Sequence, residues 1–377
     1  MSGSVSIVTQ EGPAIDRIVD QVWSRALMKI MKGGAVASSR AVLGDDIDRF
    51  VPQSVTGALL NANPAFAKLL YTSGYTSAKR NAYFIVRRLG MPADFFWKFD
   101  YWTDDRAFKV LQGVLGRIFA SLMSKQKQGH LLLVSVDVES CAFQVSFASC
   151  VECSGQISPN PLCCFHAGVF AGIFAAMLDR DMDAYEEECP ASGGQTCKFT
   201  IGVRDARPMK MPFDDWLDRF SSGVDIVETA LKSLAGDAPD SEKLVDIGYY
   251  QLLVSSCFLP HAELFEGAYH AAGVEIGHRL APILREGLSG PPWSKIEEFY
   301  RLIRHMSVSV SDLGQGLEVS VSEAPEAHGA LEDNPLTAFI YGELESLLSD
   351  LTDRELRHEG TNHEPDGLRI RFAPQVR

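Results

Sequence analysis

The sequence has no hydrophobic run long enough to cross a membrane and no excess of positive charge. Its longest uncharged, largely apolar run, residues 163–178, has 16 residues, whereas a spanning helix needs about 20. The first 16 residues lack the apolar core of a secretory signal, so we expect a cytoplasmic protein without a membrane span. Lysine and arginine number 35 against 49 aspartates and glutamates, and this net charge of −14 argues against nucleic-acid binding.

Cysteine is scarce outside one short segment. Seven of the eight cysteines lie within residues 141–197, and the eighth is Cys257. A reducing compartment does not favour a disulfide framework, so this crowding indicates metal or redox chemistry. With 46% hydrophobic and 22% charged residues over 377 positions, the chain has enough material for a folded core and about two domains.

An internal repeat organises the chain. At a constant shift of 174 positions, residues 145–185 align with 319–359 without a gap, and 11 of the 41 pairs are identical. A weaker match upstream aligns Gly74 with Gly273. We therefore expect an N-terminal extension, a first repeat, a linker with a helix, and a second repeat, at residues 1–48, 49–203, 204–239 and 240–377.

Each repeat has helical patterns followed by strand patterns. Apolar residues spaced three and four apart, or continuous apolar runs, predict helices at 66–89, 107–124, 163–178, 249–259, 261–284, 294–306 and 337–351. Alternating apolar and polar residues predict strands at 131–138, 143–150, 183–188, 196–202, 307–311, 317–323, 356–360 and 368–373. Gly168 and Gly172 indicate that a strand or helix closely approaches the apolar helix. The predicted class is α+β, with helices on one face of a small antiparallel sheet in each repeat.

Three cysteines and one glutamate have the spacing of a metal site. Cys189 and Cys197 flank a turn with two glycines at its tip, and Glu186 lies three residues before Cys189. Cys163 begins the apolar helix, where the helix dipole stabilises a thiolate. Three thiolates and a carboxylate suit a tetrahedral zinc ion. The alternative is that these cysteines are small buried apolar side chains.

A second cysteine pair, Cys150 and Cys153, could bind zinc or act as a dithiol. Because it ends the strand predicted at 143–150, where residues three apart face opposite sides, we prefer the first set and assign Cys164 to the core. The second repeat carries non-ligand or altered residues at the four positions, so we expect one zinc ion, in the first repeat; these residues are Thr337, Gly360, His363 and Ile370.

This segment resembles the 4-vinyl reductase domain, a family predicted to bind hydrocarbons and shared with the sensor domains of phenol- and toluene-responsive activators. The residues that carry the resemblance are Cys163, Gly168, Gly172, Glu186, Cys189, Gly194, Cys197 and Phe199. The resemblance implies a structural zinc held by Cys163, Glu186, Cys189 and Cys197. It also implies an apolar or aromatic ligand beside the zinc-held strands and the apolar helix.

The candidate ligand-binding residues are aromatic. The resemblance places a group of phenylalanines beside the ligand: Phe143, Phe147, Phe165, Phe170 and Phe174. Trp97 and Trp102 belong to a segment, 95–102, with six aromatic residues in eight positions. Such a segment lines a ligand or packs a core, and the pattern leaves both open. The same choice applies to His166, as a core residue or as a polar group facing the ligand.

These patterns favour binding over catalysis. The chain has no GxGxxG motif or phosphate loop, and a zinc ion with four protein ligands has no position for water, so we name no catalytic residue. We expect a zinc-containing protein that binds or senses a small apolar or aromatic molecule and acts through a partner protein. The alternatives are an accessory or assembly subunit of a redox enzyme complex, and an enzyme similar to a tetrapyrrole vinyl reductase.

Overall fold

The computed structural model describes nine segments of the chain: 46–88, 102–122, 128–158, 160–204, 244–286, 292–304, 306–323, 336–364 and 367–375. All of them belong to one compact unit, Ser38–Arg377. Trp97, the predicted linker helix and nearly all of the N-terminal extension lie outside the described residues. Within the described residues, every helix is too short or too polar to cross a bilayer.

The helices and strands agree closely with the ranges expected from the sequence. The helices are α2 (Phe50–Ala62), α3 (Phe66–Arg88), α4 (Asp104–Leu122), α5 (Cys164–Leu178), α8 (Ile247–Leu253), α9 (Ala262–Glu286), α10 (Pro292–Phe299) and α11 (Leu336–Thr352). The strands are β1 (Asp46–Asp48), β2 (His130–Asp137), β3 (Ala142–Ala148), β4 (Met182–Glu188), β5 (Cys197–Val203), β6 (Leu244–Asp246), β7 (Ser307–Asp312), β8 (Leu317–Ser322), β9 (Leu356–Glu364) and β10 (Gly367–Pro374).

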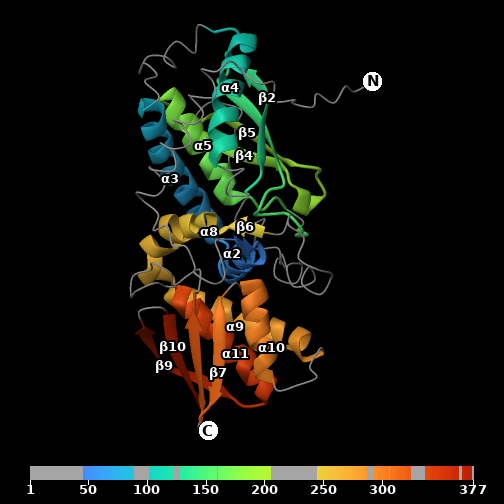
Figure 1. Cartoon of the computed structure of the whole chain (residues 1–377). Helices are drawn as coiled ribbons and strands as arrows, with labels where there is room; N and C mark the ends of the chain where they lie inside the picture. The colour runs from blue at the N-terminus through green and yellow to red at the C-terminus, as the bar shows by residue number, and fades with distance from the viewer. Residues whose placement is uncertain are drawn as a thin grey trace, which may run out of the picture. The chain divides into compact units, whose positions relative to one another are not determined.

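Two four-stranded antiparallel sheets form the core of the two halves. Their strand orders are β2-β3-β5-β4 and β7-β8-β10-β9, so corresponding strands occupy corresponding places. In the first half α5 packs against α3 and against β4 and β5, and in the second half α11 packs against α9 and β9 (Figure 1). This arrangement confirms the predicted α+β class.

The two halves also share unusual backbone positions. Ser149 and Glu323 both adopt a left-handed conformation, with φ of 54° and 55°, and Asp179 and Asp353 both have a φ of 53°. The members of each pair are 174 residues apart, the shift that aligns the sequences. A left-handed φ is uncommon for residues other than glycine, so its recurrence follows a shared chain path rather than a shared composition.

Glycines allow the main helix pair of each half to touch backbone to backbone. A Cβ atom on Gly74 or Gly168 would overlap the carbonyl oxygen of Phe165 or Tyr71, across the α3–α5 contact. Gly273 and Gly342 make the matching contacts between α9 and α11, against Phe339 and His270. The close approach expected at Gly168 is therefore confirmed, and it involves a helix.

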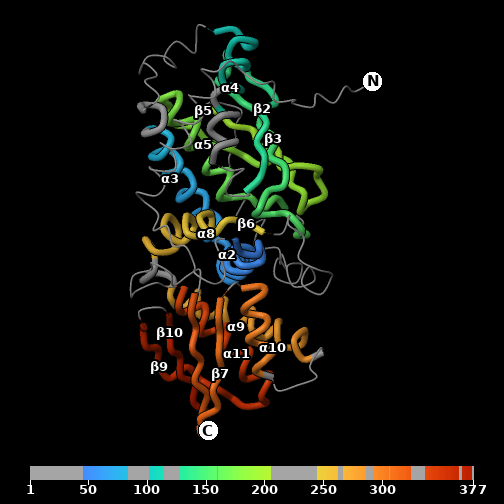
Figure 2. Tube along the Cα trace, in the orientation of Figure 1, coloured from blue at the N-terminus to red at the C-terminus, as the bar shows by residue number. Residues whose placement is uncertain are grey.

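Helix α2 and the short β1–β6 ladder were not expected from the sequence. In the ladder Ile47 is opposite Val245, and the strand from each half pairs antiparallel with the strand from the other. Asp48 and Asp246 then accept hydrogen bonds from the backbone N–H groups two residues ahead, at 2.8 and 2.7 Å, and so start α2 and α8 in the same way. Figure 2 shows α2 and α8 next to each other on either side of this ladder.

The helices α2 and α8 each contact the half to which they do not belong in sequence. Helix α2 packs against α9, and Phe50 makes an edge-to-face contact with Phe299. In turn, Tyr249 of α8 stacks on His166 of α5, with ring centroids 5.9 Å apart and planes 6° apart. The halves therefore exchange helices across the ladder.

Candidate metal centre

A bulge in β4 places Glu186 inside the protein. Glu186 is opposite Phe199 and Glu188 is opposite Lys198, so Glu187 is the extra residue. The bulge turns Glu187 and Glu188 to the surface, where Glu188 pairs with Lys198 at 2.6 Å, while Glu186 is only 1% exposed. It also lets Glu186 and Cys189, an odd number of residues apart, face the same side.

The start of α5 brings Cys163 to Glu186. The backbone N–H of Cys163 donates a hydrogen bond of 2.9 Å to Glu186 Oε2, which satisfies a free N–H at the helix N-terminus. The other carboxylate oxygen, Oε1, is buried and has no hydrogen-bond partner within the described residues. An unpartnered buried carboxylate oxygen is costly unless a cation binds it.

The turn between β4 and β5 has the shape expected of a metal-binding knuckle. The backbone N–H groups of Ser192 and Gly194 donate to the carbonyl of Cys189, at 3.0 and 2.9 Å, and Gly193 has a φ of 95°. This tight turn returns the chain to Cys197, the first residue of β5. Both thiols are fully buried.

The four residues predicted to bind zinc form one cluster. One donor atom from each of Cys163, Glu186, Cys189 and Cys197 lies within 4.8 Å of all the others. The Sγ atom of Cys163 is 3.5 Å from that of Cys197 and 4.0 Å from that of Cys189. A tetrahedral zinc ion with Zn–S bonds of about 2.3 Å holds its sulfur ligands about 3.8 Å apart, so these residues fit the ion.

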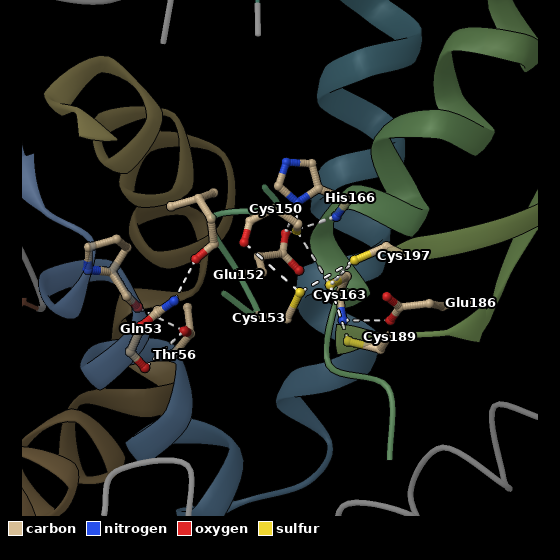
Figure 3. Close-up of polar contacts among 12 residues, drawn as sticks. Gln53, Thr56, Cys150, Glu152, Cys153, Cys163, His166, Glu186, Cys189 and Cys197 are labelled. Carbon is tan, nitrogen blue, oxygen red and sulfur yellow. Dashed lines mark hydrogen bonds and ion pairs between the residues drawn. The ribbon is translucent and has the colours of Figure 1, made fainter. Parts of the chain in front are cut away.

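Cys150 and Cys153 join the same cluster, contrary to the expectation that they face opposite sides of a strand. Strand β3 ends at Ala148, because Ser149 is left-handed, and the next residues form a turn in which the N–H of Ser154 donates to Cys150 O at 2.9 Å. Both side chains therefore point to one side. Their sulfurs lie 3.5 Å from Cys163 Sγ and 3.3 Å from Cys197 Sγ, respectively (Figure 3).

The buried donors shift one another's protonation. Hydrogen bonds from Cys153, Cys163 and Cys197 lower the pKa of Cys189 far below its usual range. Burial raises the pKa of Glu186, and the negative charge of Cys189 raises it further. Anionic sulfur and a carboxylate held together away from water need a cation, and thiolates favour a metal such as zinc.

His166 lies beside the cluster and is paired. Its Nδ1 atom is 2.7 Å from Glu152 Oε1 and 3.7 Å from Cys150 Sγ. Burial alone would lower the pKa of His166, but the charges of Glu152 and Cys150 outweigh it and raise the pKa to about 10. His166 is therefore a buried cation in an ion pair, as well as a ring that packs on Tyr249.

Helix α2 holds the turn that carries Cys150 and Cys153. Gln53 Nε2 donates hydrogen bonds to the carbonyls of Val151 and Ser154, at 2.7 and 3.0 Å (Figure 3). Gln53 is 4% exposed, so these bonds are shielded from water. No sequence pattern indicated this contact, because α2 itself was not expected.

The phenylalanines predicted to face a ligand are all buried. Phe143 contacts Phe174 with ring centroids 4.5 Å apart, and Phe147 contacts Phe170 at 5.4 Å. Phe165 lies apart from these pairs and borders a cavity of about 20 Å³ between α2, α5 and α8. Trp102 is 8% exposed, with the Arg106 guanidinium over its ring. The cavity has room for about one water molecule.

The corresponding positions of the second half show a different solution. Gly360 and His363 lie in β9 and Ile370 in β10, and these two strands extend to Glu364 and Gly367 as a continuous ladder. Backbone hydrogen bonds thus join the strands where the first half has the cysteine turn. Both donor clusters found within the described residues belong to the first half.

The comparisons with known proteins cover parts of the chain. An uncharacterized protein of Methanocaldococcus jannaschii is 31% identical over 90 residues, 23% of this chain and 50% of that protein, so the chain spans about half the length of this curated relative. Two solved structures are similar at low TM-scores. Trafficking protein particle complex subunit 3 from Naegleria fowleri, covalently bound to palmitic acid, is 10% identical (TM-score 0.29, 50% of this chain and 95% of that chain).

The other is the phenol-responsive sensory domain of the transcription activator PoxR with phenol, which is 14% identical (TM-score 0.31, 48% of this chain and 89% of that chain). The family comparison is specific to one segment. Residues 143–203, which contain Cys163, Glu186, Cys189 and Cys197, match the 4-vinyl reductase domain, and this confirms the resemblance predicted from the sequence.

Proposed function

We propose that this chain is a zinc-containing protein that binds or senses a small apolar or aromatic molecule and acts through a partner protein. The observation that carries the proposal is the convergence of Cys163, Glu186, Cys189 and Cys197 in one buried cluster within the segment that matches the 4-vinyl reductase domain. Zinc bound there would join the start of α5 to β4 and β5, and so would fix the helix that carries Phe165, Phe170 and Phe174.

The ligand site that we propose lies along α5. Phe165 links the aromatic side of this helix to the small cavity, whose other walls include Leu60 of α2 and Leu253 of α8. A ligand larger than water would have to separate these helices. Because α2 and α8 come from different halves, ligand binding here would change how the halves pack, which gives a route from binding to a response in a partner protein.

Native mass spectrometry of the full chain with phenol, toluene and a medium-chain alkane tests this proposal. We expect one bound molecule per chain with zinc retained. The variant Phe165→Gln should weaken binding about tenfold or more, because a buried aromatic contact contributes about 1.5–3 kcal/mol. The control Leu302→Gln changes a leucine that is 48% exposed and should bind normally. Binding to neither protein, or equally to both, would contradict the site.

We further propose that the two halves arose by duplication of one unit. The equal strand order, the paired left-handed residues and the matching glycine contacts support this. The second half would then serve as a structural mate that supplies α8 to the first. This role also favours an accessory or assembly subunit as the alternative function. Turnover of a nicotinamide or flavin cofactor by the pure chain would favour an enzyme instead.

A further inference from the structure

The cysteine cluster contains more sulfur than one zinc ion can use. Two overlapping sets of four donors are present: Cys150, Cys153, Cys163 and Cys197 form one, and Cys163, Glu186, Cys189 and Cys197 form the other. Every member of both sets is buried. A tetrahedral ion in the second set leaves Cys150 and Cys153 without a metal, although they touch its ligands.

The shared residues have the geometry of bridging ligands. Cys163 and Cys197 belong to both sets, and their sulfurs are 3.5 Å apart. In Figure 3, Cys150 and Cys153 lie on one side of Cys163, and Glu186 and Cys189 lie on the other. The two sets are thus tetrahedra that share one edge. A thiolate has lone pairs for two metal ions, so two sulfurs at this distance can bridge a pair of tetrahedral ions.

The outer sulfurs also have the required distances. Cys150 Sγ is 3.5 Å from Cys163 Sγ, and Cys153 Sγ is 3.3 Å from Cys197 Sγ. These values approach the separation of about 3.8 Å between sulfurs on one tetrahedral ion. Gln53 holds the turn between Cys150 and Cys153 by two buried hydrogen bonds, so the pair is already ordered beside the bridging sulfurs.

We propose that the first half binds two thiophilic divalent ions, such as zinc, with Cys163 and Cys197 as bridging ligands. Cys150 and Cys153 complete the site of one ion, and Glu186 and Cys189 complete the site of the other. The inference rests on the proposed zinc site, because both ions use Cys163 and Cys197. It replaces the single zinc ion expected from the sequence and gives the cysteine pair a metal-binding role.

Metal titration of the full chain under reducing conditions tests the proposal. Cobalt(II) should bind at two equivalents, with the absorption of tetrahedral cobalt thiolate, and zinc should displace both. The second equivalent should reduce the electron paramagnetic resonance signal per cobalt, because bridging thiolates couple the two spins. Native mass spectrometry of the zinc-loaded chain provides an independent count that requires no variant.

Three variants separate the two positions. The double variant Cys150→Ser/Cys153→Ser should bind one ion without spin coupling, and Glu186→Gln/Cys189→Ser should also bind one. The control Cys164→Ala changes a buried cysteine outside both sets and should bind two.

One ion in the unaltered chain, retained in Cys150→Ser/Cys153→Ser, would overturn the second position and leave the proposed zinc site intact. One ion that is lost in that variant and kept in Glu186→Gln/Cys189→Ser would overturn the pair of ions and also the assignment of Glu186. A chain that binds no metal would overturn the inference and the zinc site of the proposed function together.

Discussion

Cys189 links the tight turn after β4 to the buried cluster, and its loss should affect the fold as well as metal content. The variant Cys189→Ser replaces a strong zinc ligand with a weak one. We expect zinc affinity to fall by several orders of magnitude and the free energy of unfolding to fall by several kcal/mol, because structural zinc sites supply folding energy. Elemental analysis and urea unfolding measure the two effects.

The matched control for that prediction is Cys257→Ser, since Cys257 is equally buried but lies outside both donor sets. It should keep its zinc and lose only the smaller stability expected for a polar substitution in the core. If Cys189→Ser retained zinc, or if both variants lost it, Cys189 would not be a ligand.

At this scale the sequence predicted composition better than direction. The spacing of Glu186, Cys189 and Cys197 was sufficient to predict their cluster. The position of Cys150 and Cys153 depended on the left-handed backbone of Ser149, and serine gives no sign of such a conformation in the way that glycine or asparagine does. The bulge at Glu187 is equally hidden, because it follows from the pairing of β4 with β5.

Among the elements, the helix pairs α3–α5 and α9–α11 depend on glycine. Helix α9 contains a crossing glycine, Gly273, and an exposed glycine, Gly267, beside which a Cβ atom would meet nothing within 4 Å. We expect Gly273→Ala to destabilise the protein by about 1–3 kcal/mol, since the new methyl group would overlap the carbonyl of Phe339.

The control Gly267→Ala should act in the opposite direction. Alanine favours a helix over glycine by about 1 kcal/mol, and Gly267 has open space around it. Thermal unfolding of both variants provides the comparison. Equal effects of the two substitutions would show that the close helix contact at Gly273 is not energetically important.

The predicted helices and strands show which elements a sequence pattern can find. Helix α5 was predicted at 163–178 because its apolar run is long, and it occupies Cys164–Leu178. Helix α2 was missed because ten of its thirteen residues are buried, so it has no polar face to produce a helical period. The ladder of β1 with β6 has three residues per strand, which is too short for a recognisable alternation.

For the whole molecule, Arg304 is the charged group that joins the halves. It is 1% exposed, pairs with Glu343 of α11 and donates a hydrogen bond of 2.9 Å to Ser54 of α2. Its guanidinium lies between the rings of Phe50 and Phe339, at 5.2 and 5.3 Å. Arg304 therefore satisfies a buried carboxylate in the second half and holds α2 of the first.

A double-mutant cycle measures this role. Arg304→Met should cost about 3–5 kcal/mol, because it leaves Glu343 buried and unpaired. Glu343→Leu in addition should recover most of that loss, since an apolar pair of similar volume replaces the ion pair. Chemical unfolding of the single and double variants gives the coupling energy. A double variant as unstable as the sum of the two single variants would indicate that the ion pair itself contributes little.

The exchange of α2 and α8 has a consequence for residues 240–377 expressed alone. In the full chain Tyr249 packs on His166 and Phe165, and α9 packs against α2, so both surfaces would be uncovered in the fragment. The fragment would also have an unpaired β6. Exposed apolar surface of this kind favours association.

We expect that fragment to self-associate rather than remain a stable monomer. The β1–β6 ladder pairs Ile47 with Val245, and each strand leads into an aspartate-capped helix, so a second copy of β6 can take the place of β1. Two fragments would then cover each other's exposed faces by exchanging α8. Light scattering and thermal unfolding at several concentrations measure the result, because the stability of a dimer rises with concentration. A monomer with concentration-independent stability would mean that the second half does not need the first to complete its fold.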